Sequence, residues 1–126
     1  MNLVDSSAWL EYFAGGPNAG FFAPAIEAVG KLVVPTVVLL EVFKRVRQQR
    51  GVGDALQVTA VMQQGNVVDL DAPLAISAAE LGVAHRLPLA DSVILATGRR
   101  QRAVIWTQDA DFDGLEGVRF HPKARA

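Results

Sequence analysis

The sequence predicts an α/β fold, whose mainly parallel central sheet has about five short strands flanked by helices. Two observations support the α/β prediction. Short apolar runs recur along the chain, and helical segments separate most of these runs from one another. Parallel strands that are covered on both faces are typically continuous apolar runs, and they need crossover connections of this kind.

The expected elements follow in order along the chain. Strands are expected at the short apolar runs, which are residues 3–4, 31–34, 67–70, 103–106 and 118–120. Helices are expected at residues 8–13, 18–29, 35–50, 54–64, 72–86 and 88–102. Gly15 and Gly16 end the first helix, and Pro35 stands at a tolerated first-turn position. Residues 51–53 are expected to be a break, and residues 109–114 a turn-rich loop.

Length and composition exclude several classes of protein. The chain has 126 residues with 12 basic and 13 acidic side chains, so we expect one globular domain over residues 1–126. The absence of Cys excludes disulfides, thiolate metal sites and cysteine nucleophiles, and the two His argue against a zinc site. The start of the chain lacks a signal peptide and no stretch of about 20 apolar residues occurs, so we expect a cytoplasmic protein without a membrane partner.

Basic residues gather in clusters after residue 43. The clusters are Lys44, Arg45, Arg47 and Arg50; Arg99, Arg100 and Arg102; and Arg119, Lys123 and Arg125. Such clusters are compatible with a surface that binds a polyanion. They are equally compatible with solvated helix ends, where cations interact favourably with the helix dipole.

Four acidic residues stand inside otherwise apolar segments. Asp5 and Asp109 follow expected strands, and Glu41 and Asp91 lie in early helix turns. Each has an alternative explanation, as a helix cap, a turn residue, a solvated side chain or a favourable partner of the helix dipole. Because ligand sites of open parallel sheets lie beyond the carboxyl ends of the strands, we expect all four to converge on that edge.

The chemistry open to four clustered carboxylates is limited. Like charges at about 4–6 Å cannot all be ionised unless a cation compensates them. Without Cys and with few His, that cation is expected to be Mg²⁺, with Mn²⁺ as a substitute. A bound cation of this kind activates water and stabilises charge on a phosphoryl group. The sequence therefore predicts a metal-dependent phosphodiesterase that acts on nucleic acid.

Four segments in order resemble a known family. They are VDSSAWL at residues 4–10, PTVVLLEV at 35–42, LPLADSVILA at 87–96 and WTQDADF at 106–112. In this order and spacing they resemble PIN-domain ribonucleases, and most closely the toxin half of a VapBC-type toxin–antitoxin pair. The resemblance covers essentially the whole chain and implies a PIN-like fold.

The resemblance also implies roles for individual residues. The metal-binding and catalytic acids would be Asp5, Glu41, Asp91 and Asp109, with Asp111 as a rival for the fourth position. Thr107 would orient the fourth acid or a water on the metal, and Ser6 would be a supporting hydroxyl donor.

The implied activity is Mg²⁺- or Mn²⁺-dependent endonucleolytic cleavage of RNA. The implied partners are the RNA substrate, a second copy of the chain in a homodimer, and a cognate antitoxin that inserts a basic residue into the acidic pocket. Two alternatives stay open, which are a catalytically silent PIN-like RNA-binding module and an RNA-processing nuclease outside a toxin–antitoxin pair. A dehalogenase-like phosphatase needs a second acid where Ser7 stands, and is therefore disfavoured.

Overall fold

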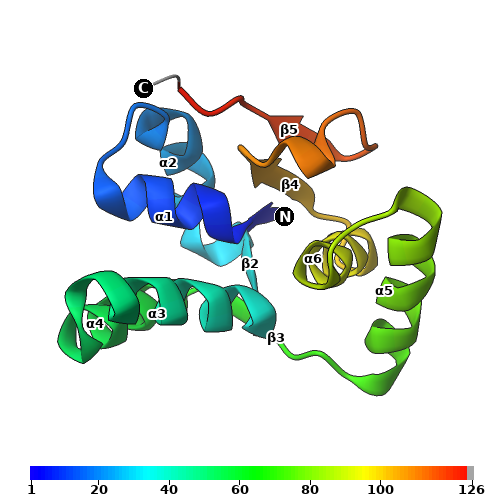
Figure 1. The fold of residues 1–126 in the computed structure, drawn as a ribbon, viewed down its shortest axis with the longest axis horizontal. Coiled ribbons are helices and arrows are strands. Elements are labelled where there is room, and N and C mark those ends of the chain that lie inside the picture. Colours follow the sequence, from blue (N-terminus) through cyan, green and yellow to red (C-terminus); the bar gives the residue numbers. More distant parts are fainter. Residues whose placement is uncertain (125–126) are drawn as a thin grey trace.

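The five strands form one parallel sheet in the order β3-β2-β1-β4-β5 within residues 1–124, the part of the chain that this computed structural model describes (Figure 1). The strands are β1 (Asn2–Val4), β2 (Leu32–Pro35), β3 (Asn66–Val68), β4 (Val104–Thr107) and β5 (Val118–Phe120). Every neighbouring pair is parallel. The predicted α/β fold with a parallel sheet of about five strands is confirmed.

Helices cover both sides of this sheet. The α-helices of the described residues are α1 (Ser6–Ala14), α2 (Ala19–Glu27), α3 (Thr36–Arg50), α4 (Val52–Met62), α5 (Ala72–His85) and α6 (Leu89–Arg100). Two 3₁₀ turns are η1 (Val29–Lys31) and η2 (Ala110–Phe112). In Figure 1, α1 and α2 lie on one side of the strands, and α5 and α6 lie on the other. Helix α3 packs against α1, α4 and α6.

Several element boundaries differ from those expected. Helix α2 ends at Glu27, and Lys31 belongs to η1 instead of a strand. Strand β3 begins at Asn66, whose side chain donates to the Leu32 carbonyl at 3.0 Å. The expected break at residues 51–53 reduces to Gly51, whose φ of 94° is readily reached only by glycine, so α4 begins at the next residue. The expected loop at residues 109–114 contains η2.

The apolar core fixes the central strands under the helices. Leu3 and Val4 of β1 and Val33 of β2 are fully buried, as is Trp9 of α1. Helix α3 contributes a stripe at intervals of four residues, which consists of Val38, Val42 and Val46. Because this stripe turns toward the core, the polar residues between its members face other directions, and Glu41 and Arg45 are among them. Among residues 1–124, no helix is both long and apolar enough to cross a membrane.

Candidate metal centre

The four predicted acids are carried by elements that meet at one edge of the sheet. Asp5 directly follows β1, and Asp109 lies two residues after β4 ends. Strands β1 and β4 are parallel neighbours, so both carboxyl ends open onto the same edge. The chain runs from β1 outward to β2 and β3, and returns to β4 on the opposite side of β1, which makes this a topological switch point. The first two turns of α3 and the first turn of α6 bring Glu41 and Asp91 to it.

A hollow of about 290 Å³ collects these side chains. Its lining includes all four predicted acids, Asp5, Glu41, Asp91 and Asp109. The rest of the lining is Ser6, Ser7, Leu10, Arg45 and Ile94. The hollow therefore brings together acids that are as far as 104 residues apart in the sequence. Their positions next to expected strand ends and in early helix turns predicted this convergence.

Asp5 lies at the bottom of the cluster and is held by three donors. Its Oδ1 accepts hydrogen bonds from the Ala8 backbone N–H at 2.9 Å and the Ser7 hydroxyl at 2.8 Å. Its Oδ2 accepts from the Thr107 hydroxyl at 2.5 Å. Asp5 is thus the N-cap of α1 as well as a member of the acidic cluster, so the structural explanation and the functional one apply together. Burial raises the pKa of Asp5 to about 6, although the hydrogen bonds oppose this rise.

Thr107 connects the first acid to the fourth. The buried Thr107 hydroxyl donates to Asp5 and accepts from the backbone N–H of Asp109 at 2.8 Å. The single donor of this hydroxyl is therefore used on Asp5, and its contact with Asp109 is to the backbone instead of the carboxylate. Through these two bonds Thr107 sets the distance between the end of β1 and the loop after β4.

Asp91, Asp109 and Asp111 form the tightest group of acids. One carboxylate oxygen from each lies within 4.8 Å of the others. The pKa of Asp91 is raised to about 7, first by burial and then by the negative charges of Asp109, Asp111, Asp5 and Glu41. Asp109 and Asp111 differ in position, because Asp109 lines the hollow and Asp111 is exposed. Asp109 also accepts the Asp111 backbone N–H at 2.9 Å, which caps η2.

Ser6 of α1 holds Glu41 of α3 by a hydrogen bond. The Ser6 hydroxyl donates to Oε1 of Glu41 at 2.5 Å, across 35 residues of sequence. Ser6 therefore supports the acid of α3 and not its own neighbour Asp5, which is instead bonded by Ser7. Sequence reasoning did not assign a role to Ser7. No local pattern pointed to this bond, because an Asx turn joins an Asp side chain to the backbone two residues on and not to a hydroxyl.

Two side-chain amides, those of Asn18 and Gln108, support the loop that carries Asp109. The Asn18 side chain donates to the Gln108 side-chain oxygen at 3.0 Å and to the Pro122 carbonyl at 2.9 Å. Gln108 in turn donates to the Ser7 carbonyl at 3.4 Å. These contacts join α1, the loop before α2 and the segment after β4. No local sequence pattern predicted them, because Asn18 and Gln108 are 90 residues apart.

The residues present fit a hard divalent cation. The hollow offers carboxylate and hydroxyl oxygens, which Mg²⁺ and Mn²⁺ prefer, and no nitrogen of an imidazole or sulfur of a thiol lines it among the described residues. Burial raises the pKa of both Asp5 and Asp91, and neighbouring negative charges raise that of Asp91 further, so the ionised carboxylates need compensation by positive charge. A divalent cation in contact with them would supply that compensation.

Comparisons with known proteins place this architecture in a family. No curated protein matches the sequence. Among solved structures, a toxin–antitoxin complex from Klebsiella pneumoniae superimposes with a TM-score of 0.79 at 22% identity, over 94% of this chain and 95% of that one. The sarcin–ricin loop cleaving toxin VapC20 from Mycobacterium tuberculosis superimposes with a TM-score of 0.71 at 20% identity, over 90% of this chain and 92% of that one. VapBC2 from Rickettsia felis, bound to a promoter DNA fragment, superimposes with a TM-score of 0.73 at 11% identity, over 96% of this chain and 97% of that one. These likenesses concern the fold.

The sequence itself matches the family model of the PIN domain over residues 3–118. The matched region runs from β1 to the first residue of β5 and includes Asp5, Glu41, Asp91 and Asp109. The resemblance inferred from the four sequence segments is confirmed. This chain belongs to the PIN domain family.

Proposed function

We propose that this protein is a Mg²⁺- or Mn²⁺-dependent endoribonuclease and the toxin of a type II toxin–antitoxin pair. The observation that carries the proposal is the convergence of Asp5, Glu41, Asp91 and Asp109 in one hollow at the switch point of the sheet. Family membership supports a nuclease, and the toxins and the toxin–antitoxin complex among the structural neighbours support the toxin assignment.

The cation would be held chiefly by Asp91 and Asp109, with Asp5 beneath them and Glu41 opposite. When bound, such a cation activates water for attack on a phosphodiester and stabilises the charge that develops on the phosphoryl group. Ser7 and Thr107 direct the Asp5 carboxylate by donating to its two different oxygens. Ser6 holds the Glu41 carboxylate toward the hollow. These hydroxyls fix the ligands before the cation binds, and they are positioning residues in this proposal.

The hollow also suggests how an antitoxin would inhibit the enzyme. A basic side chain would find several carboxylates and would occupy the place of the cation. Arg suits this role better than Lys because its guanidinium pairs with two carboxylate oxygens at once. The structural neighbours from Klebsiella pneumoniae and Rickettsia felis are a toxin–antitoxin complex and a VapBC2 assembly, which supports an antitoxin partner here.

A homodimer is supported by an apolar stripe on the outer face of α5. The side chains of Ile76 and Val83 are 68% and 82% exposed and lie seven residues apart on one face of the helix. Leu89, at the start of α6, is 86% exposed. A second copy of the chain that covered these side chains would remove them from water. Light scattering on Val83→Glu, compared with the wild type, would test whether this face joins two copies.

The activity is tested by incubating the protein with structured and single-stranded RNA after exhaustive treatment with EDTA. We expect no cleavage in EDTA, recovery with Mg²⁺ or Mn²⁺, and no requirement for Zn²⁺. Asp91→Asn is expected to lower the cleavage rate at least ~10²-fold while the fold is retained, equivalent to about 2.7 kcal/mol of lost transition-state stabilisation. Full cleavage by metal-free protein would refute the proposal, and RNA binding without any cleavage would favour a silent binding module.

A further inference from the structure

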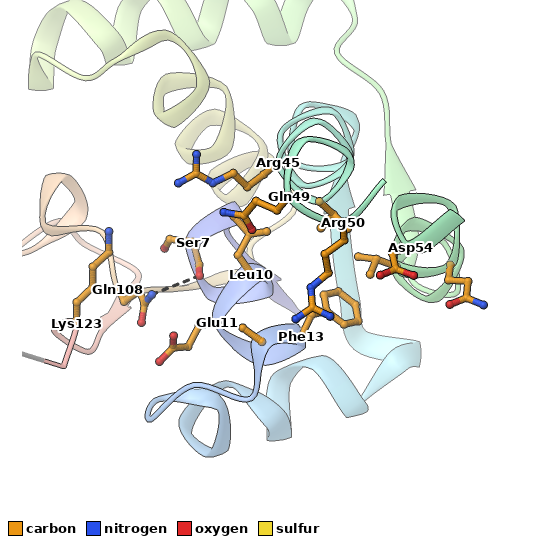
Figure 2. Close-up of a pocket in the computed structure, with 14 residues that line it drawn as sticks. Ser7, Leu10, Glu11, Phe13, Arg45, Gln49, Arg50, Asp54, Gln108 and Lys123 are labelled. Atoms are coloured by element: carbon orange, nitrogen blue, oxygen red, sulfur yellow. Dashed lines mark hydrogen bonds between the residues drawn. The ribbon is translucent and has the colours of Figure 1, made fainter. Parts of the chain in front are cut away.

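A second and larger hollow lies beside the acidic one. It has a volume of about 600 Å³ and runs along α1, between α3 and α4 on one side and the segment after β4 on the other (Figure 2). Leu10, Phe13 and Val46 give it an apolar floor. Its polar rim includes Arg45, Arg50, Gln49, Gln108 and Lys123. This hollow is not part of the metal centre described above, and the proposed mechanism does not use its rim.

The two hollows are continuous. Ser7, Leu10 and Arg45 line both of them. Ser7 donates to Asp5, so one end of the larger hollow opens at the proposed metal centre. The other end lies near Ala14 at the end of α1, about 10 Å away at the 1.5 Å rise of an α-helix. A chain that passes through the acidic hollow has room to continue along this path.

The cations of the rim are available to a ligand. Within residues 1–124, the only ion pair joins Arg100 to Asp71, so Arg45, Arg50 and Lys123 have no carboxylate partner there. Glu41 lies one turn before Arg45 on α3, but it accepts a hydrogen bond from Ser6. Figure 2 shows Arg45 and Lys123 on the side of the hollow near Ser7 and Gln108, and Arg50 near Phe13.

Two acids line the larger hollow, Glu11 and Asp54, so they are fewer than the three cations of its rim. Glu11 is engaged, because its carboxylate accepts the Asn18 backbone N–H at 2.8 Å. Asp54 lies in the first turn of α4, at the far end from the acidic hollow. The end that meets the metal centre therefore carries two cations of this hollow, Arg45 and Lys123, and one of its acids, Glu11. A basic end next to an acidic centre suits a polyanion whose neighbouring phosphates would otherwise be repelled.

We propose that this hollow binds the sugar–phosphate backbone of a single-stranded RNA next to the bond that is cleaved, with Arg45 on the nearest phosphate and Arg50 and Lys123 farther along. The inference rests on the proposed ribonuclease function and adds a path and a direction for the substrate. A positively charged groove with an aromatic side chain on which a base can stack is typical of proteins that follow single strands without reading their sequence, and Phe13 is the aromatic residue of this hollow. Arg45 is a substrate-binding residue in this arrangement, and the acids remain the catalytic set.

The test compares Arg45→Ala with Arg47→Ala, a matched control. Both residues are exposed arginines of α3 and both substitutions remove one positive charge, but Arg47 does not line either hollow. Binding of a fluorescent single-stranded RNA pool of random sequence is measured by anisotropy in EDTA, at salt concentrations from about 50 to 200 mM. The steady-state KM and kcat for the same RNA are then measured with Mn²⁺.

We expect Arg45→Ala to weaken RNA binding roughly tenfold and to reduce the salt slope of log K by about 0.7, the loss expected for one phosphate contact with a single strand. The KM should rise far more than kcat falls. Arg45→Lys should restore the salt slope, because a lysine retains the charge, and Arg50→Ala should show the same effect in smaller degree. Arg47→Ala should behave as the wild type does.

The outcomes separate this inference from the function on which it rests. If the wild type cleaves RNA with Mn²⁺ and Arg45→Ala matches Arg47→Ala in affinity and KM, the RNA path is refuted while the ribonuclease stands. That result would leave a protein segment, such as an antitoxin, as the occupant of the hollow. If the wild type does not cleave RNA but Arg45→Ala still reduces RNA binding and its salt slope, the groove stands and the ribonuclease proposal fails.

Discussion

Replacing Asp91 by Asn should stabilise the metal-free protein, because it removes a charge that the folded state tolerates poorly. The Asp91 carboxyl is half-buried and faces the charges of Asp109, Asp111, Asp5 and Glu41, so its pKa rises from 3.8 to about 7. Asparagine has nearly the same shape and carries no charge. The structure favours Asp91 over Asp5 for this experiment, because Asp5→Asn would place an amide N–H₂ against the Thr107 hydroxyl or the Ala8 N–H.

The size of the effect follows from the pKa shift. A rise of about three units corresponds to about 4 kcal/mol at about 1.36 kcal/mol per unit, before solvent is considered. Because the carboxyl is only half-buried, screening by water reduces the expected gain to about 1–2 kcal/mol. For a domain of this size that is a rise in Tm of roughly 4–8 °C.

The stability difference between the wild type and Asp91→Asn should depend on pH. The folded pKa of Asp91 is raised, so the folded state binds more protons than the unfolded state between about pH 4 and pH 7. The wild type is therefore most favoured below the unfolded pKa, and it loses stability as pH rises through the folded pKa of about 7. Asp91→Asn does not titrate at this position, so its advantage in Tm should be absent near pH 3 and complete above about pH 7.

Thermal melts of the wild type and Asp91→Asn in EDTA, at pH values from 3 to 8, measure this difference. Asp69→Asn is the matched control, because Asp69 is exposed and lies outside the acidic cluster. Millimolar Mg²⁺ should raise the Tm of the wild type more than that of Asp91→Asn, since only the former retains the ligand. The reasoning is refuted if Asp91→Asn melts below the wild type at pH 8 in EDTA, or if the difference in Tm does not change with pH.

Three further outcomes are expected. Asp109→Asn should reduce RNA cleavage at least ~10-fold more than Asp111→Asn in a rate assay, because only Asp109 lines the acidic hollow. Thr107→Val should lower the cleavage rate about tenfold or more and Thr107→Ser should largely preserve it, because the hydroxyl is what bonds Asp5 and the Asp109 N–H. Gly98→Ala should lower the free energy of unfolding, measured in urea, by about 1–3 kcal/mol, because the added Cβ would lie 2.8 Å from Ile105 Cδ1. Adding Ile105→Val to Gly98→Ala should recover part of this loss.

The sheet was predictable because its strands are apolar runs too short for helices, and because longer helical segments separate most of them. Each of the five expected strands is present, and the errors lie at their ends. The strand expected at residues 31–34 begins one residue later, because Lys31 belongs to a 3₁₀ turn. The strand expected at residues 67–70 begins at Asn66, whose side-chain amide bonds to the Leu32 carbonyl on the neighbouring strand. Such cross-strand contacts are not visible in a single segment of sequence.

The acidic hollow was predictable for a different reason. Each acid stands where an apolar segment reaches the carboxyl end of a strand or the first turns of a helix, and parallel strands bring those places together. The partners of the acids were not predictable in the same way. The resemblance gave Ser6 as a supporting hydroxyl donor without naming the acid it supports. Helix geometry turns Ser6 toward Glu41 on α3 and leaves Asp5 to Ser7 and Thr107.

This division of the hydroxyls explains how the fold holds four acids close together without a cation. Three of them each have a tie to the backbone or to a hydroxyl: Asp5 through Ser7, Ala8 and Thr107, Glu41 through Ser6, and Asp109 through the Asp111 N–H. Asp91 has no such hydrogen bond among the described residues, and its pKa is raised the most. Burial and the charges of its neighbours therefore act most strongly on the acid of the hollow that the protein does not hold by hydrogen bonds. A cation that enters the hollow would relieve the charge of Asp91 first, while the other acids are already oriented to complete its coordination.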